Sequence, residues 1–125
     1  IIYPELHYGR DALVGIALFL ALLVDKKCKV SELKPQYSEY FMKKIKITLE
    51  DSNLIDRSFK VIAENYSELS PNTEDGVRID FEDAWVHMRK SNTEPIIRIF
   101  AEANSQDIAD SYALKIEKEI KSISA

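Results

Sequence analysis

The residues best suited to chemistry lie in a short polar segment, residues 90–95 (KSNTEP), between two predicted strands. Ser91 and Thr93 supply hydroxyl groups, Asn92 supplies a side-chain amide, and the segment offers a run of backbone N–H groups. Asn92 also tolerates the left-handed backbone conformation, which turns successive amides inward to form a concavity for an anion. The composition of this segment predicts an oxyanion cradle.

Two arginines flank the segment. Arg89 ends one predicted strand and Arg98 is the third residue of the next, so the two-residue period of a strand places both guanidinium groups beside the segment. A planar guanidinium binds phosphate through two parallel hydrogen bonds. Polar residues are also common in ordinary turns, and arginines on strands are often only solvated. On these residues alone, phosphate binding and a plain turn both stay open.

Composition limits the other classes of function. The chain has 125 residues and a net charge of -4, with 17 basic and 21 acidic residues and a pI of about 5.2. This balance supplies no bulk field for a polyanion, so a bound anion must be held by a local site. Lys43, Lys44 and Lys46 form no continuous basic stripe with interleaved aromatic residues. We therefore expect no binding of nucleic acid.

Metal and redox chemistry are also not expected. His7 and His87 are far apart in the sequence and lack the spacing of metal ligands. Cys28 is the single cysteine, so it forms no disulfide within the chain. We expect no metal site, no catalytic residue in this chain, and a reducing compartment, the cytoplasm.

From residue 40 onward the hydrophobic pattern predicts the order β-α-β-β-β-α. Strands are expected over residues 40–49, 77–81, 85–89 and 96–101, and one-sided helices over residues 52–67 and 105–123. Short connections favour antiparallel pairing, and two one-sided helices favour packing on one face of a sheet. We expect an α+β domain of two layers, with a four-stranded, mainly antiparallel sheet.

The N-terminal part has a different pattern. A helix is expected over residues 12–26, capped by Asp11, and its apolar stretch of 13 residues (ALVGIALFLALLV) is shorter than the roughly 18 that a membrane span needs. We therefore expect no association with a membrane. A helix that is apolar on every side needs covering on most of its surface, so the chain is expected to be a fragment. We expect the helix over residues 12–24 to dock on its own domain or on a second copy.

At the polar segment the sequence resembles a known family. Residues 89–95 (RKSNTEP) resemble the R-x-S-[GN]-T-E-P phosphate-binding loop in the C-terminal domain of the α-D-phosphohexomutases, the superfamily of phosphoglucomutase, phosphomannomutase and phosphoglucosamine mutase. Residues 75–86 (DGVRIDFEDAWV) resemble the hairpin before that loop, and residues 97–103 (IRIFAEA) the strand after it. Upstream, residues 2–4 (IYP) and 7–11 (HYGRD) resemble the closing part of the family's third domain.

The resemblance implies a domain organisation. Residues 1–36 would be the end of the third domain, with a hinge near residues 30–38, and residues 37–125 would be the C-terminal phosphate-binding domain. Lys90 stands where the family often has Pro, and Ala84 where it often has Gly, and neither change removes a phosphate donor.

The resemblance also implies which residues bind the substrate. The donors to the phosphate of a hexose phosphate would be Arg89, Ser91, Asn92 and Thr93, and the strand geometry adds Arg98.

The activity implied for the full-length parent is that of an intramolecular phosphotransferase. It would interconvert hexose 1-phosphate and hexose 6-phosphate through a phosphoserine and a bisphosphorylated intermediate, with Mg²⁺. The family's phosphoserine, its D-x-D-x-D magnesium loop and its G-E-x-[SN]-G sugar loop are absent from these 125 residues. We therefore expect the chain alone to be inactive and to bind no Mg²⁺. The alternative is an independent anion-binding or protein-interaction module with no catalytic parent.

Overall fold

The structure is a computed structural model, and it describes residues 1–49 and 51–123. The chain forms two compact units, Ile1–Ser38 and Glu39–Ala125. The boundary predicted from the sequence, between residues 36 and 37, lies two residues before this one. Each unit has its own local structure.

The N-terminal unit consists of helix α1 (Ala12–Lys26), the short helix α2 (Val30–Leu33) and the 3-10 turn η1 (Lys34–Gln36). Asp11 caps α1 as predicted, because its carboxylate accepts a hydrogen bond of 3.0 Å from the backbone N–H of Val14. That hydrogen bond, together with one to His7, lowers the pKa of the Asp11 carboxyl. The bounds of α1 confirm the predicted helix.

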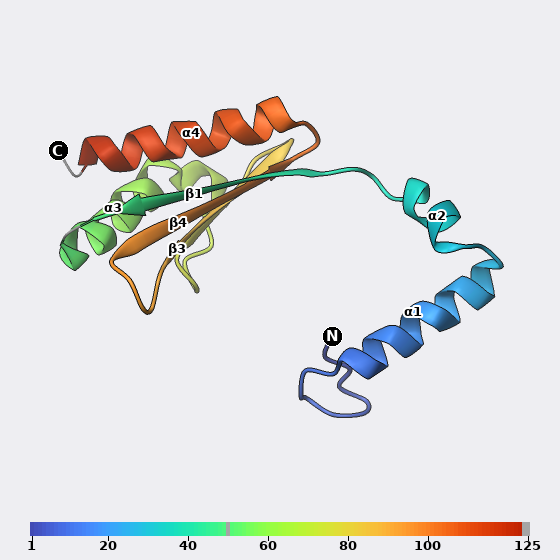
Figure 1. Ribbon diagram of the computed structural model, residues 1–125. Coiled ribbons are helices and arrows are strands. Elements are labelled where there is room, and N and C mark those ends of the chain that lie inside the picture. The colour runs from blue at the N-terminus through green and yellow to red at the C-terminus, as the bar shows by residue number, and fades with distance from the viewer. Residues whose placement is uncertain (50, 124–125) are drawn as a thin grey trace. The chain divides into compact units, whose positions relative to one another are not determined.

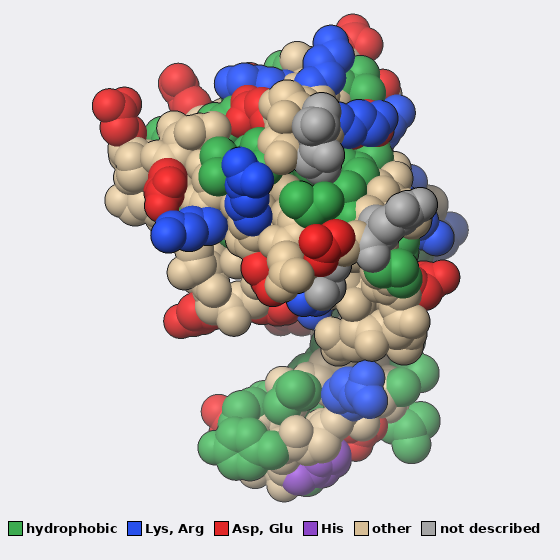
Figure 2. Space-filling model, turned by 90° about the vertical axis from the view of Figure 1, so that its left-hand side faces the viewer, with side chains coloured by type: hydrophobic (Ala, Val, Ile, Leu, Met, Phe, Trp, Pro, Cys, Tyr) green, Lys and Arg blue, Asp and Glu red, His purple; other side chains and the backbone are tan. Residues whose placement is uncertain are grey.

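Helix α1 carries large apolar side chains at its surface. Within the chain, Leu13 is 77% exposed and Ile16 and Leu20 are each 55% exposed, whereas Leu23 is half-buried. On the face shown in Figure 2, hydrophobic side chains (green) lie at the surface of this unit. No helix in the described part of the chain is long and apolar enough to cross a membrane.

The C-terminal unit has the predicted order of elements (Figure 1). They are β1 (Phe41–Thr48), α3 (Ser52–Asn65), the 3-10 turn η2 (Ser67–Leu69), β2 (Val77–Asp80), β3 (Ala84–Lys90), β4 (Ile96–Ala103) and α4 (Gln106–Ile123). The four strands form one antiparallel sheet in the order β1-β4-β3-β2. Strands β3 and β4 are therefore the central pair, and the polar segment joins them.

One face of the sheet is covered by both helices. Ile55 and Ile62 of α3 and Ile116 and Ile120 of α4 are fully buried in one core with the inward side chains of the strands. Burial of such apolar side chains is the main force that holds the two layers together. The unit is the expected two-layer α+β domain.

Several element boundaries differ from the predicted ones by one or two residues, among them those of β4, β2 and α3. Strand β4 runs to Ala103, two residues further than expected, because Ala103 pairs with Phe41 on one side and Ala84 on the other. Strand β2 ends at Asp80, because the N–H of Phe81 donates instead to the carbonyl of Ala84 and closes the turn. Helix α3 ends at Asn65 rather than at residue 67, and a 3-10 turn follows.

Candidate anion-binding site

The segment between the two central strands is tied down at both ends. The N–H of Ser91 donates to the carbonyl of Ile96 at 3.0 Å, and the N–H of Ile96 donates to the carbonyl of Glu94 at 2.8 Å. The N–H of Leu49, just after β1, donates to the carbonyl of Pro95 at 3.0 Å. The segment is therefore held between two strand ends, which gives its side chains a defined position.

The structure brings the predicted binding residues to one hollow of about 240 Å³. The residues that line it are Arg89, Lys90, Ser91, Asn92, Thr93, Arg98 and Phe100. All five predicted residues, Arg89, Ser91, Asn92, Thr93 and Arg98, are among them. Sequence reasoning gave no role here to Lys90 or Phe100, although Lys90 is the last residue of β3 and Phe100 shares the strand face of Arg98.

Three basic side chains lie in register across the sheet beside this hollow. Arg89 of β3 pairs with Arg98 of β4, and Arg98 in turn pairs with Lys46 of β1. Ile97 and Ile99 point into the core, so the alternation of β4 turns Arg98 to the face that the helices leave open. Like charges directly opposite each other on a sheet are destabilising. A bound dianion would relieve this repulsion.

The arginines have carboxylate partners in the free domain. One guanidinium nitrogen of Arg89, Nη2, lies 2.8 Å from Oδ2 of Asp75, and Nη2 of Arg98 lies 3.7 Å from Oε2 of Glu94. The Nε atom of Arg98 is buried and has no hydrogen-bond partner within residues 1–49 and 51–123. Both guanidinium groups therefore keep N–H donors for a ligand.

Asp75 is a residue that sequence reasoning did not assign to the site. Its backbone carbonyl accepts a hydrogen bond from Nε2 of His87 at 2.7 Å, and its carboxylate holds Arg89. The sequence offered one signal for this role: Asp75 comes directly before Gly76, in a turn next to strand β2. Asp75 acts on the site by orienting Arg89.

The backbone of the segment differs from the expected concavity of inward amides. Within the described residues, the non-glycine positions with positive φ are Lys27 and Ser70, so Asn92 is not left-handed. The N–H of Ser91 is used by the carbonyl of Ile96. The hydroxyl oxygens of Ser91 and Thr93 lie 3.5 Å apart. The donors that this site offers are therefore chiefly side-chain groups.

Neither a metal site nor a continuous basic surface stands out in the described part of the chain. Among the described residues there is no group of three or more His, Cys, Asp or Glu side chains that could hold a metal ion. On the face shown in Figure 2, basic (blue) and acidic (red) side chains are interspersed over the C-terminal unit. The positive charges available to hold an anion are thus the side chains beside the loop, Arg89 and Arg98.

The structure thus gathers arginines and hydroxyl groups at one loop between the central strands of a small two-layer domain, an arrangement whose charge and donors suit an anion. Comparison with known families places the chain. The family described as "Phosphoglucomutase/phosphomannomutase, C-terminal domain" matches residues 26–119. The chain therefore belongs to this family.

Curated relatives are similar over most of the chain. The phosphoglucosamine/phosphogalactosamine mutase of Sulfurisphaera tokodaii is 37% identical over 118 residues, which cover 93% of this chain and 26% of the relative. The phosphoglucomutase/phosphomannomutase of Thermococcus kodakarensis is 36% identical over 118 residues, which cover 90% of this chain and 25% of the relative. The chain thus spans about a quarter of the length of these relatives.

Solved structures share the fold. The N-acetylphosphoglucosamine mutase of Aspergillus fumigatus, in complex with GlcNAc-6P and magnesium, superposes with a TM-score of 0.58 at 18% identity, covering 92% of this chain and 22% of that one. A serine-to-alanine variant of that enzyme, in complex with glucose 1,6-bisphosphate, gives a TM-score of 0.62 at 16% identity, covering 95% of this chain and 22% of that one.

Proposed function

We propose that this chain is the substrate-phosphate-binding part of a phosphohexomutase, and that its loop holds the phosphate of a hexose phosphate. The observation that carries this proposal is the hollow in which Arg89 and Arg98, in register on neighbouring strands, lie beside the hydroxyl groups of the loop. A phosphate monoester dianion matches both the charge and the donors of this hollow. The names of the relatives support a phosphosugar as the ligand.

The chemical contribution of the domain would be positioning. Phosphoryl transfer depends chiefly on orientation and on stabilisation of charge. Arg89 and Arg98 would donate to the phosphate oxygens from one side, while Ser91, Asn92 and Thr93 would donate from the loop. With one phosphate held in this way, the other end of the hexose would face a phosphoserine supplied by the rest of the parent, where Mg²⁺ would stabilise charge. Residues 30–38 would serve as the hinge for closure.

The proposal makes a prediction about where activity resides. We expect the full-length parent to convert hexose 1-phosphates into hexose 6-phosphates in a coupled assay with Mg²⁺, and this chain alone to give no turnover under the same conditions. The reason is that the family's phosphoserine and its magnesium loop are absent from these 125 residues. Turnover by the chain alone would contradict the proposal, as would a full-length protein that acts on none of the glucose, mannose and glucosamine phosphates.

The exposed face of α1 leads to a second expectation, that the chain associates with a second copy through this helix. Burial of apolar side chains such as Leu13, Ile16 and Leu20 would drive the contact. Sedimentation analysis should show a concentration-dependent dimer, which Ile16→Lys with Leu20→Lys should convert to a monomer. A wild-type chain that stays monomeric at all concentrations, with this helix exposed, would contradict the expectation.

The single cysteine favours a cytoplasmic location for the parent.

A further inference from the structure

The row of cations across the sheet continues onto the edge strand β1. Arg89 and Arg98 line the hollow at the loop, and Lys46 of β1 is the register partner of Arg98. Ile45 and Ile47 pack in the core, so the alternation of β1 places Lys46 on the face that the helices leave open. Opposite residues of paired strands have Cβ atoms about 4.5–5.5 Å apart. Lys46 therefore stands directly beside an arginine of the proposed phosphate site.

A lysine on this face of β1 can reach the residues that line the hollow. Lys44 is the register partner of Phe100, and its Nζ lies over the Phe100 ring, 5.9 Å from the centroid. Phe100 is itself part of the wall of the hollow. The end of β1 approaches the loop, where the N–H of Leu49 donates to the carbonyl of Pro95 at 3.0 Å, so Lys46 is nearer to the loop than Lys44 is. The ammonium group of Lys46 can therefore reach an anion held in the hollow.

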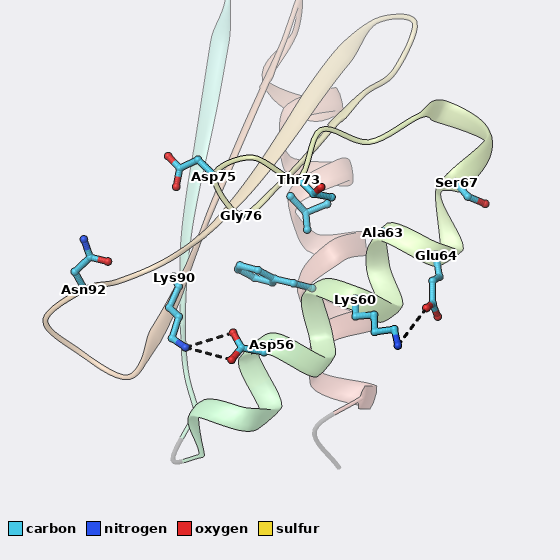
Figure 3. Close-up of a pocket in the computed structure, with 12 residues that line it drawn as sticks. Asp56, Lys60, Ala63, Glu64, Ser67, Thr73, Asp75, Gly76, Lys90 and Asn92 are labelled. Carbon is cyan, nitrogen blue, oxygen red and sulfur yellow. Dashed lines mark hydrogen bonds and ion pairs between the residues drawn. The ribbon is translucent and has the colours of Figure 1, made fainter.

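Lys90, the other lysine near the loop, is directed to the opposite side of the sheet. It lines the hollow, but its ammonium group reaches across to α3, where Nζ lies 3.3 Å from Oδ1 of Asp56 (Figure 3). Met88 is buried in the core and shares the strand face of Lys90, so Lys90 belongs to the face that the helices cover. Lys90 is therefore not the cation that adds to Arg89 on the open face.

The charges along the row do not cancel. Asp75 lies 2.8 Å from Arg89, and Glu94 lies 3.7 Å from Arg98. The side chain of Lys46 is exposed, and no carboxylate of residues 1–49 and 51–123 lies within ion-pair distance of it. Three cations thus face two carboxylates, and the row keeps one positive charge in the free domain. Lys46 carries the charge that the described part of the chain leaves unbalanced.

We propose that Lys46 is a third cation of the phosphate site, and that its ammonium group donates to an oxygen of the phosphate that Arg89 and Arg98 hold. This inference rests on the proposed phosphate-binding role of the loop and adds to it a residue from β1, which lies outside the loop motif. The dianion of a phosphate monoester has three terminal oxygens, so it can accept hydrogen bonds from two guanidinium groups and one ammonium group. The sequence pattern hid this residue, because Lys43, Lys44 and Lys46 form no continuous basic stripe.

The test measures binding of methyl phosphate to the 125-residue chain at about pH 8, where this probe is a dianion. We expect Lys46→Gln to raise the Kd by about threefold to fivefold, the effect of a favourable ion pair at an exposed site. Lys46→Arg keeps the charge and should stay within about 1.5-fold of the wild type. In the wild type, the NMR signal of the Lys46 side-chain Cε group should shift on binding. Because Lys46 is exposed on an edge strand, both variants should keep the fold.

Lys43→Gln is the matched control. Lys43 lies on the same strand with the same charge, but it faces α4, where its Nζ lies 3.4 Å from Oδ1 of Asp110. The control removes the same net charge from β1, so its affinity for methyl phosphate should stay within about 1.5-fold of the wild type. Equal losses in the two glutamine variants, or a loss that Lys46→Arg does not restore, would contradict the proposal.

The same titrations separate this inference from the role of the loop. Binding of methyl phosphate that Lys46→Gln leaves unchanged would overturn the role of Lys46 alone. If the wild-type chain binds no methyl phosphate, the phosphate role of the loop fails, and the role of Lys46 fails with it.

Discussion

If the loop binds the phosphate of a phosphosugar as proposed, replacing Arg89 with glutamine should raise the KM of the full-length protein for that phosphosugar by about tenfold or more and change kcat much less. Hydrogen bonds to charged groups are worth roughly 1.5–3 kcal/mol, and about 1.4 kcal/mol corresponds to a factor of ten. Arg89 lines the hollow at the loop and stands in register with Arg98, so its loss removes a charged donor to the phosphate. An interaction made equally with substrate and transition state appears in KM. Steady-state kinetics on the purified variant measures both KM and kcat.

The matched control for this variant is Arg78→Gln. Arg78 has the same charge and lies on the neighbouring strand β2, but it pairs with Asp80 at 2.7 Å and stacks on Trp85, and it does not line the hollow. The control changes the net charge equally, so an unspecific loss of positive field would weaken binding in both variants. An unchanged KM for Arg89→Gln, or equal effects of the two substitutions, would contradict the assignment of Arg89 to the phosphate.

Replacing Gly76 with alanine should destabilise the C-terminal unit by at least about 2–3 kcal/mol. Gly76 has a φ of +80°, a conformation that side chains rarely adopt, and a Cβ there would collide with the backbone carbonyl oxygen of Met88. Thermal unfolding followed by circular dichroism should show a midpoint lower by about 10 °C or more, since 1 kcal/mol shifts a domain of this size by about 4–8 °C. The neighbouring Asp75 holds Arg89, so phosphate binding should weaken as well.

Gly15→Ala is the control for the glycine effect. Gly15 lies inside α1, where an added Cβ meets only side-chain atoms of Ile1 at 3.3 Å or more, and alanine favours a helix by roughly 0.8–1.0 kcal/mol over glycine. This variant should leave the unfolding of the C-terminal unit unchanged. A Gly76→Ala chain as stable as the wild type would show that the turn before β2 can move away from β3.

The features of the fold that depend on local sequence pattern, namely the helices, the strands and their order, were predictable. The bounds of α1 followed from the cap at Asp11 and the apolar run, and the order of elements followed from alternation and one-sided helices. The extra residues of β4 were not predictable, because Ala103 is held by pairing with two strands rather than by its own propensity. The sheet order β1-β4-β3-β2 is likewise a property of long-range pairing.

The site was predictable in its membership and less so in its geometry. Strand parity placed Arg89 and Arg98 together, and the structure adds that they are register partners. Asn92 tolerates the left-handed conformation, which suggested a concavity of backbone amides, but the hydrogen bonds that tie Ser91 and Pro95 to strand ends hold the loop in another conformation. The contact between Asp75 and Arg89 depends on how the turn at Gly76 packs, which local pattern does not encode.

The most direct test of the account is an NMR titration of the 125-residue chain with glucose 6-phosphate at pH 7.5, where the phosphate is largely a dianion, with glucose as the control ligand. The account predicts shifts concentrated at residues 89–93 and at Arg98 with the phosphosugar, and no such shifts with glucose. Mannose 6-phosphate should give the same set of shifts, because the account places only the phosphate at the loop. An absence of shifts at these residues at millimolar phosphosugar, or equal shifts with glucose, would contradict a phosphate-binding role for this loop.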